Sequence, residues 1–212
     1  MSAVTEFITL TLRNPSSSPS AITDVLSALK PVPGVISLHT GRQLENPSVQ
    51  VVVITWASPE AFTSFAASSS YTPWFASLKA LAAPSPAPVF YKVPFTPDPA
   101  AVLAAPCTEV FVAYGAEPGF VGQTEDFARG LGGAPGPVPG FHGHAYGEVS
   151  TPLGFGADGE QQGPAVTLLL GWDSKEAHME AKGKPGPISD NIHLLRTGRK
   201  DISMYHVNLE QV

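Results

Sequence analysis

The chain contains the same sequence pattern twice, and an internal repeat constrains the architecture more than any single motif does. PVPGVISLHTG at 31–41 recurs as PVPGFHGHAYG at 137–147, and VVVITWASPEAF at 51–62 recurs as VTLLLGWDSKEAH at 166–178. Two further pairs of segments keep this order: TEF at 5–7 with TEV at 108–110, and VFYKVPF at 89–95 with SMYHVNL at 203–209. Four matched pairs in one order indicate a duplication.

Each half predicts the order strand, helix, strand, strand, helix or helices, strand. EFITLTL at 6–12 alternates as a strand does, and SAITDVLSALK at 20–30 has apolar residues at helical spacing. After the third strand of the first half, Ser58, Pro59 and Glu60 supply a cap, a first-turn proline and a first-turn acid. We therefore predict an α+β fold with an element order common to both halves.

A Pro- and Ala-rich stretch near 96–106 is the natural linker between the halves. The predicted domains are an N-terminal half at 1–98 and a C-terminal half at 106–212. A chain of 212 residues is long enough for two such domains.

The PVPG-strand units, together with TWASPEAFTSF and GWDSKEAHMEA, resemble the dimeric α+β barrel superfamily. Specifically, the chain looks like a tandem fusion of two antibiotic-biosynthesis-monooxygenase-like domains. The resemblance implies two ferredoxin-like units that form one intramolecular, pseudo-dimeric α+β barrel, and hence a monomer. Members include cofactor-independent monooxygenases of aromatic polyketides, and related barrels include polyketide cyclases and haem-degrading enzymes. The family shares no catalytic motif that can be carried over to particular residues, and fold alone does not fix function.

The charge pattern argues against several partners. The chain has 12 Lys and Arg against 18 Asp and Glu without a basic cluster, so nucleic acid and anionic membranes are poor partners. No basic, apolar leader opens the chain, and no apolar run approaches a membrane span. A lone Cys107 favours a cytoplasmic location. No nucleotide-binding loop or nucleophile elbow is present, and we expect no cofactor.

The repeat serves as an internal control for three polar side chains of the second PVPG strand. His142, His144 and Tyr146 alternate, so a regular strand would place them on one face. The first half has Ile36 and Leu38 where the second has the two histidines, which indicates a buried face. A solvated face remains the alternative for each histidine.

The helix after Trp172 shows a matching exchange, because His178 stands where the first half has Phe62, part of an apolar helical face. If helix and strand face each other, His178 joins the histidines of the second PVPG strand in one cleft. If that strand instead faces the interior of the barrel, these side chains do not meet. His142, His144, His178 and Tyr146 are the predicted catalytic residues.

The second half carries ten extra residues, which fall in TPLGFGADGEQQG at 151–163. We expect a surface insertion or, beside a polar pocket, a lid that carries Leu153 and Phe155. With Trp172 and Tyr205, these residues are the predicted substrate-binding set, although Trp172 also recurs as Trp56, as a packing residue would.

The remaining histidines are expected outside the site. His39 should be exposed or at the domain interface, His193 at the surface, and His206, which replaces Lys92, in solvent or at the interface.

Imidazoles beside a tyrosine can move a proton near neutral pH. The first hypothesis is a small cofactor-independent enzyme that acts on a hydrophobic, aromatic or polyketide-like secondary metabolite by cyclisation, dehydration, isomerisation or oxygenation. The second is a non-catalytic barrel that binds a small hydrophobic ligand or takes part in a stress response. The third is a metal-dependent enzyme on the same histidines, against which stands the lack of a carboxylate that is clearly inward-facing. The predicted site therefore contains no metal.

Overall fold

The computed structural model describes residues 2–15, 20–133, 138–156 and 159–212. Pro137 of the second PVPG repeat and residues 157–158 of the insertion lie outside this description. The chain divides into two compact units, of which unit 1 comprises residues 1–94 and 209–212, and unit 2 comprises residues 95–208. Within the described residues no helix is both long and apolar enough to span a membrane.

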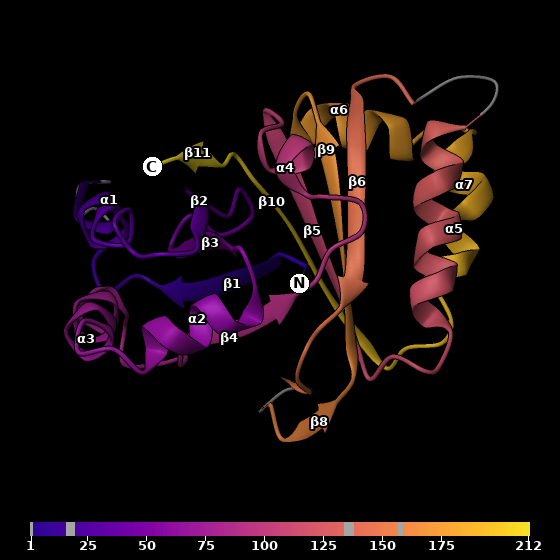
Figure 1. Cartoon of the computed structure of the whole chain (residues 1–212). Coiled ribbons are helices and arrows are strands. Elements are labelled where there is room, and N and C mark those ends of the chain that lie inside the picture. Colours follow the sequence, from indigo (N-terminus) through magenta and orange to yellow (C-terminus); the bar gives the residue numbers. More distant parts are fainter. Residues whose placement is uncertain (1, 16–19, 134–137, 157–158) are drawn as a thin grey trace. The chain divides into compact units, whose positions relative to one another are not determined.

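Unit 1 is an antiparallel sheet with helices, drawn in Figure 1 in indigo to magenta except for its C-terminal strand, which is yellow. Its strand order is β11-β2-β3-β1-β4. The elements are β1 (Val4–Thr11), α1 (Ser20–Ser27), β2 (Val35–Arg42), β3 (Val49–Trp56), α2 (Pro59–Ala66), α3 (Tyr71–Leu81), β4 (Val89–Val93) and β11 (Glu210–Gln211). The sequence assigns the C-terminus to the second half, whereas β11 pairs with β2 and so belongs to the first unit.

Unit 2 repeats this arrangement with the order β10-β5-β9-β6, the counterpart of β4-β1-β3-β2. The elements are α4 (Ala100–Leu103), β5 (Cys107–Tyr114), α5 (Phe120–Gly132), β6 (Phe141–Glu148), β7 (Leu153–Phe155), β8 (Gln161–Gly163), β9 (Ala165–Trp172), α6 (Lys175–Lys182), α7 (Pro187–Asn191), the 3₁₀ turn η1 (Ile192–Leu195) and β10 (Asp201–Val207). Helix α4 forms within the predicted linker. The α+β fold with two ferredoxin-like units is confirmed, and their closure into a barrel stays a prediction.

The helix starts that the repeat predicts are confirmed in both units. The Oγ of Ser58 accepts a hydrogen bond from the backbone N–H of Ala61 at 3.3 Å, and the Oγ of Ser174 accepts one from Ala177 at 3.1 Å. Each serine satisfies an amide that a helix start leaves without an intrahelical partner.

The glycine of each PVPG segment has a positive φ, +88° at Gly34 and +77° at Gly140. A Cβ at Gly34 would lie 2.4 Å from the Cβ of Ala61, and one at Gly140 would lie 3.1 Å from that of Ala177. Glycine therefore allows the turn to adopt this backbone conformation and to approach the first turn of α2 or α6.

Each unit has a core between its sheet and its helices. Trp56 in unit 1 and Trp172 in unit 2 are fully buried in these two cores. Figure 1 shows α5 and α7 beside the sheet of unit 2. The candidate site lies on this helix-covered face of the sheet.

Candidate active site in unit 2

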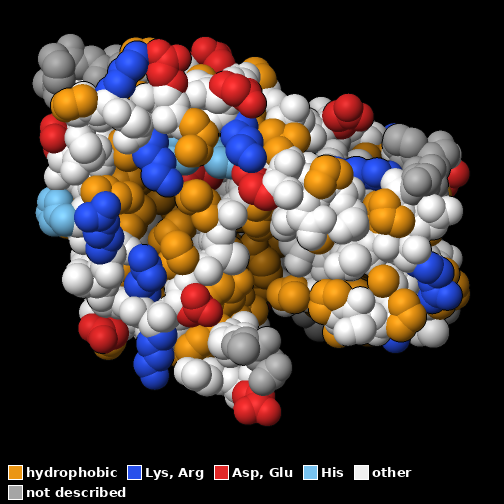
Figure 2. Space-filling model, turned by 180° about the vertical axis from the view of Figure 1, so that it is seen from behind, with side chains coloured by type: hydrophobic (Ala, Val, Ile, Leu, Met, Phe, Trp, Pro, Cys, Tyr) orange, Lys and Arg blue, Asp and Glu red, His pale blue; other side chains and the backbone are white. Residues whose placement is uncertain are grey.

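A cavity of about 230 Å³ lies in unit 2 between the helix-covered face of the sheet and the surrounding helices. Its wall is mostly apolar, with side chains from β5, β9, β10, α5, α7 and η1. In Figure 2, unit 2 shows a hollow with a hydrophobic floor and with Lys and Arg side chains at its margin. A concave apolar site with few polar groups is the usual form of a small-molecule site.

Two polar side chains that line this cavity, Glu109 of β5 and His178 of α6, belong to a buried triad with His206 of β10. The exposed fractions are 4% for Glu109, 4% for His178 and 1% for His206. Nδ1 of His178 lies 2.8 Å from Nε2 of His206 and 3.4 Å from Oε2 of Glu109. The triad is fixed further by Trp172, whose Nε1–H donates to Oε2 of Glu109 at 3.0 Å.

The triad owes its arrangement to sheet register and helix capping. His206 and Glu109 are direct partners across β10 and β5, so their side chains leave the sheet on the same face. Ser174 caps α6, and the helix places His178 over the indole of Trp172, with ring centroids 4.9 Å apart.

Unit 1 has the same carboxylate and the same indole but different partners. Nε1 of Trp56 donates to Oε2 of Glu6 at 3.1 Å, and Nζ of Lys92 lies 2.8 Å from the other oxygen of Glu6. Nζ of Lys92 also lies 3.5 Å from the centroid of the Phe62 ring. The two units therefore share a buried Glu–Trp pair, with an exchange between Lys92 and Phe62 in unit 1 and two histidines in unit 2.

This exchange changes how the buried carboxylate is neutralised. A buried charge needs a partner of opposite charge or several hydrogen bonds. In unit 1 the ammonium group of Lys92 is the cationic partner of Glu6, whereas in unit 2 two imidazoles contact or adjoin Glu109 at the equivalent positions. Unit 2 thus has two buried imidazoles beside an apolar cavity, where unit 1 has a lysine and a phenylalanine.

The prediction that His142 shares a face with His144 and Tyr146 is wrong, because β6 has a bulge at this point. Phe141 pairs with Trp172 and Gly143 with Gly171, which leaves His142 as the extra residue. Nε2 of His142 lies 2.6 Å from Oδ1 of Asp173, in an exposed hydrogen bond outside the cavity.

Unit 1 has the same register shift between Val35 and Ser37, and the bulged Ile36 is 60% exposed. Ile36 is therefore no sign of a buried face, whereas Leu38 is buried in the core as expected.

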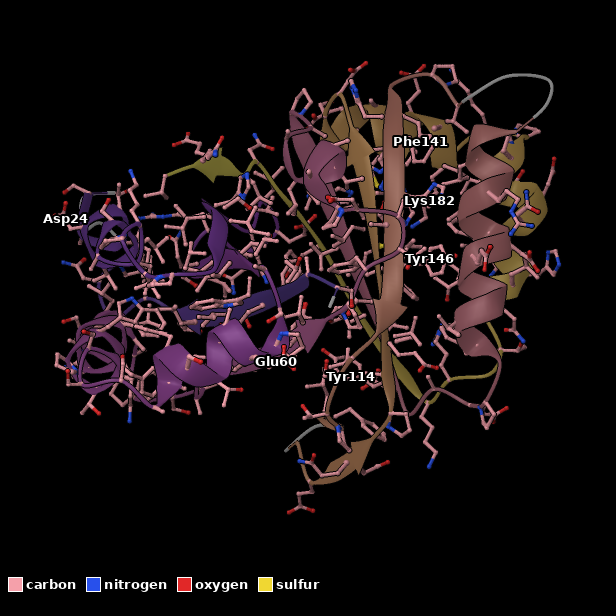
Figure 3. The ribbon with its side chains drawn as sticks, in the orientation of Figure 1. Asp24, Glu60, Tyr114, Phe141, Tyr146 and Lys182 are labelled. Carbon is pink, nitrogen blue, oxygen red and sulfur yellow. The ribbon has the colours of Figure 1, made fainter. Side chains whose placement is uncertain are left out.

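His144 and Tyr146 do face the helices, but they meet α5 rather than the triad. The Tyr146 hydroxyl is hydrogen-bonded to Glu125, which also pairs with Arg129. Figure 3 shows Tyr146 on the side of β6 toward α5. Burial lowers the pKa of His144 despite the opposing charge of Glu125, and it raises the pKa of Tyr146.

The rings of Trp172 and Phe141 lie between His144 and His178. Ring contacts lead from His178 to Trp172, from Trp172 to Phe141 at 5.3 Å, and from Phe141 to His144 at 6.5 Å. The expected cluster of three histidines therefore does not form, and of the predicted catalytic residues only His178 lines the cavity.

Among the predicted substrate-binding residues, Trp172 lines the cavity. Tyr205 precedes the inward-facing His206 in β10, so it lies on the opposite face of the sheet. Phe155 packs on Tyr114, at a centroid distance of 6.2 Å, and neither it nor Leu153 lines the cavity. The described part of the insertion is the β7–β8 hairpin, and its apolar residues do not cover the cavity.

Sequence reasoning overlooked Glu109 and placed His206 wrongly. His206 was expected in solvent or at an interface, but it is buried beside Glu109 and His178 of its own unit. His39 is buried rather than exposed, and its position at a domain interface stays a prediction. His193 is exposed, as predicted. The signal for the triad was present, because Glu6 and Glu109 occupy equivalent positions in the two halves, each as the charged residue of its strand.

The same three side chains have the donor set of a metal site. One ligand atom from each of Glu109, His178 and His206 lies within 4.8 Å of the other two. Metal–ligand bonds of about 2.0–2.2 Å place neighbouring ligand atoms about 3 Å apart, close to the 2.8 and 3.4 Å separations within the triad. The indole of Trp172 would then orient the carboxylate from outside the ligand set.

Comparison with known proteins supports the fold that the repeat indicates. Residues 20–77 match the family model described as antibiotic biosynthesis monooxygenase. This match lies within unit 1, and the fold of the whole chain is similar to that of solved structures described as monooxygenases. Among curated protein sequences, none matches it significantly.

Three solved structures share this fold over nearly the whole chain. A candidate monooxygenase from Fusobacterium nucleatum is 8% identical with a TM-score of 0.66, over 99% of this chain and 94% of its own. A candidate monooxygenase from Lactobacillus acidophilus is 10% identical with a TM-score of 0.60, over 100% and 96%. An anthrone oxidase-like protein is 14% identical with a TM-score of 0.62, over 100% and 94%. At these identities the likeness concerns the fold.

Proposed function

We propose that unit 2 is a small enzyme that removes a proton from an aromatic or polyketide-like substrate bound in its cavity. The observation that supports this proposal is the buried Glu109–His178–His206 triad beside an apolar cavity. At the equivalent positions of unit 1, Glu6 is accompanied by a lysine and a phenylalanine instead of two histidines. Unit 1 then serves as a scaffold. Since one chain supplies both units, we expect a monomer, which light scattering tests.

The geometry gives each triad member a role. When Nδ1 of His178 carries the hydrogen, it can donate to Nε2 of His206, 2.8 Å away, or toward Glu109. Nε2 of His178 is then the basic nitrogen that accepts the substrate proton. The carboxylate of Glu109 stabilises the imidazolium that forms, and the indole of Trp172 holds this carboxylate in place.

Proton removal is the first step of all the reactions named in the first hypothesis. The likeness to candidate monooxygenases and to an anthrone oxidase-like protein favours oxygenation. In that reaction the carbanion of an activated CH₂ gives its electrons to O₂ and forms a peroxide. Loss of water then leaves a carbonyl, so that one oxygen atom enters the product and the other leaves with both hydrogens of the CH₂.

The test is turnover of anthrone, a tricyclic ketone with such a CH₂, by the wild type and by His178→Asn. Positioned general base catalysis contributes about 10²–10⁴ in rate, so the variant should lose that factor in kcat while anthrone binding is retained. His193→Gln is the matched control because it changes an exposed histidine outside the cavity. Equal turnover by His178→Asn and wild type would overturn the proposal. Binding without any turnover in the wild type would support a ligand-binding protein.

A second candidate function, metal-dependent catalysis, is favoured by the ligand-like spacing in the triad. A divalent metal there would activate water or O₂, and the two histidines would be ligands rather than bases. Metal analysis of the purified protein, together with turnover after chelation, separates the two functions. Full activity of metal-free protein excludes the metal-dependent one.

A further inference from the structure

The cavity of unit 2 has an unusual charge pattern for this chain. The protein is acidic overall, with a net charge of −6, yet three of its twelve Lys and Arg residues line this one cavity. The cations are Lys182, Arg196 and Arg199, and among the described residues of the wall the one acid is the buried Glu109. The wall of the cavity therefore carries a net positive charge.

The three cations come from two segments beside the cavity. Lys182 lies one helical turn beyond His178 on α6, so both side chains are on the same side of the helix. Arg196 and Arg199 follow η1, and Nε of Arg199 donates to the carbonyl oxygen of Leu195 at 2.7 Å, which fixes the base of its guanidinium. Among the described residues no carboxylate forms an ion pair with these three. Their charge can therefore act on a bound molecule.

The repeat again provides a comparison. The position in α2 equivalent to Lys182 is Ala66, four residues after Phe62. The segment before β4, AAPSPAP at 82–88, has no charged residue, whereas the segment before β10 reads RTGRK at 196–200. The cations therefore occur in the same unit as the histidine pair and are absent from the equivalent segments of unit 1.

We propose that the ligand of this cavity is an aromatic acid, whose carboxylate is held by Lys182, Arg196 and Arg199 while its rings enter the apolar interior. Guanidinium groups bind carboxylates with two parallel hydrogen bonds, and lysine adds a point charge. Ile202 and Met204, which also line the cavity and are 40% and 38% exposed, offer apolar contact beside the cations. A molecule fixed in this way directs its apolar part toward His178. This inference rests on the proposed function for the direction of the substrate, but the charge preference can be measured without turnover.

The test compares the binding of an anthracene carboxylate with that of its methyl ester, followed by anthracene fluorescence. We expect the acid to bind at least tenfold more tightly than the ester, and added salt to weaken only the acid. Lys182→Gln and Arg196→Gln should each reduce this preference several-fold, and the triple variant that adds Arg199→Gln should abolish it. Lys184→Gln is the matched control, because it removes the same charge two residues away, outside the cavity wall.

Equal affinity for acid and ester, or an equal loss of preference in Lys184→Gln, would overturn the inference. A preference for the acid without turnover of any substrate would leave the inference standing and count against the proposed function. Equal turnover of acid and ester would overturn the inference and leave the proposed function standing.

Discussion

Replacing the two histidines of the unit 2 triad with the residues at the equivalent positions of unit 1 tests whether the two buried carboxylate sites are structurally equivalent. His178→Phe removes the hydrogen bond to Nε2 of His206 and the contact with Glu109, 2.8 and 3.4 Å long. A buried polar group that loses its partner costs about 1–3 kcal/mol, so we expect a loss of about 2 kcal/mol in the free energy of unfolding.

Adding His206→Lys to His178→Phe should recover most of this loss. In unit 1, Lys92 lies 2.8 Å from the carboxylate of Glu6 and 3.5 Å from the ring centroid of Phe62. The double variant recreates both contacts around Glu109, and a desolvated cation–π contact alone contributes about 1–2 kcal/mol. We therefore expect a coupling energy of at least about 1 kcal/mol between the two substitutions.

The assay is urea denaturation of the wild type, both single variants and the double variant, with tryptophan fluorescence as the signal. If the two units unfold in separate steps, only the step of unit 2 should shift. A double variant as unstable as the sum of the single variants, within about 0.5 kcal/mol, would refute the equivalence of the two sites.

Three further predictions concern other parts of the molecule. Burial lowers the pKa of His39 below its ordinary value of about 6.5. The unfolded state therefore binds more protons, and stability falls as the pH drops through about 6.5. His39→Gln should reduce the pH dependence of the denaturation midpoint between about pH 7 and 5. NMR titration should find the pKa of His144 below its ordinary value, and Glu125→Gln should lower it further by removing a negative charge. Gly34→Ala should cost more than about 1 kcal/mol in thermal unfolding because of its positive φ and its overlap with Ala61. Adding Ala61→Gly to this variant should recover the part of the stability loss that comes from the overlap with the Ala61 side chain.

Most of the fold can be predicted from the sequence, because apolar periodicity and helix caps are local signals and both recur in the two halves. Ser58 and Ser174 cap the helices that the pattern assigns to them. The four C-terminal residues could not be assigned in this way, because their pairing with β2 depends on contacts far away in the sequence.

The candidate site was predicted only in part, because it depends on register. A bulge of one residue puts His142 on the face opposite to His144, and strict alternation along the strand cannot reveal it. His178 was found because the repeat showed an exchange at a buried helix position. His206 was missed because its counterpart Lys92 suggests solvent, whereas that lysine reaches a buried carboxylate.

The most direct measurement of the central claim is hydrogen–deuterium exchange at the CH₂ of anthrone, followed by NMR without oxygen. The wild type should accelerate this exchange, and His178→Asn should lose about 10²–10⁴ of the acceleration, while His193→Gln retains it. Exchange that is equally fast with His178→Asn would contradict the role of His178 as the base.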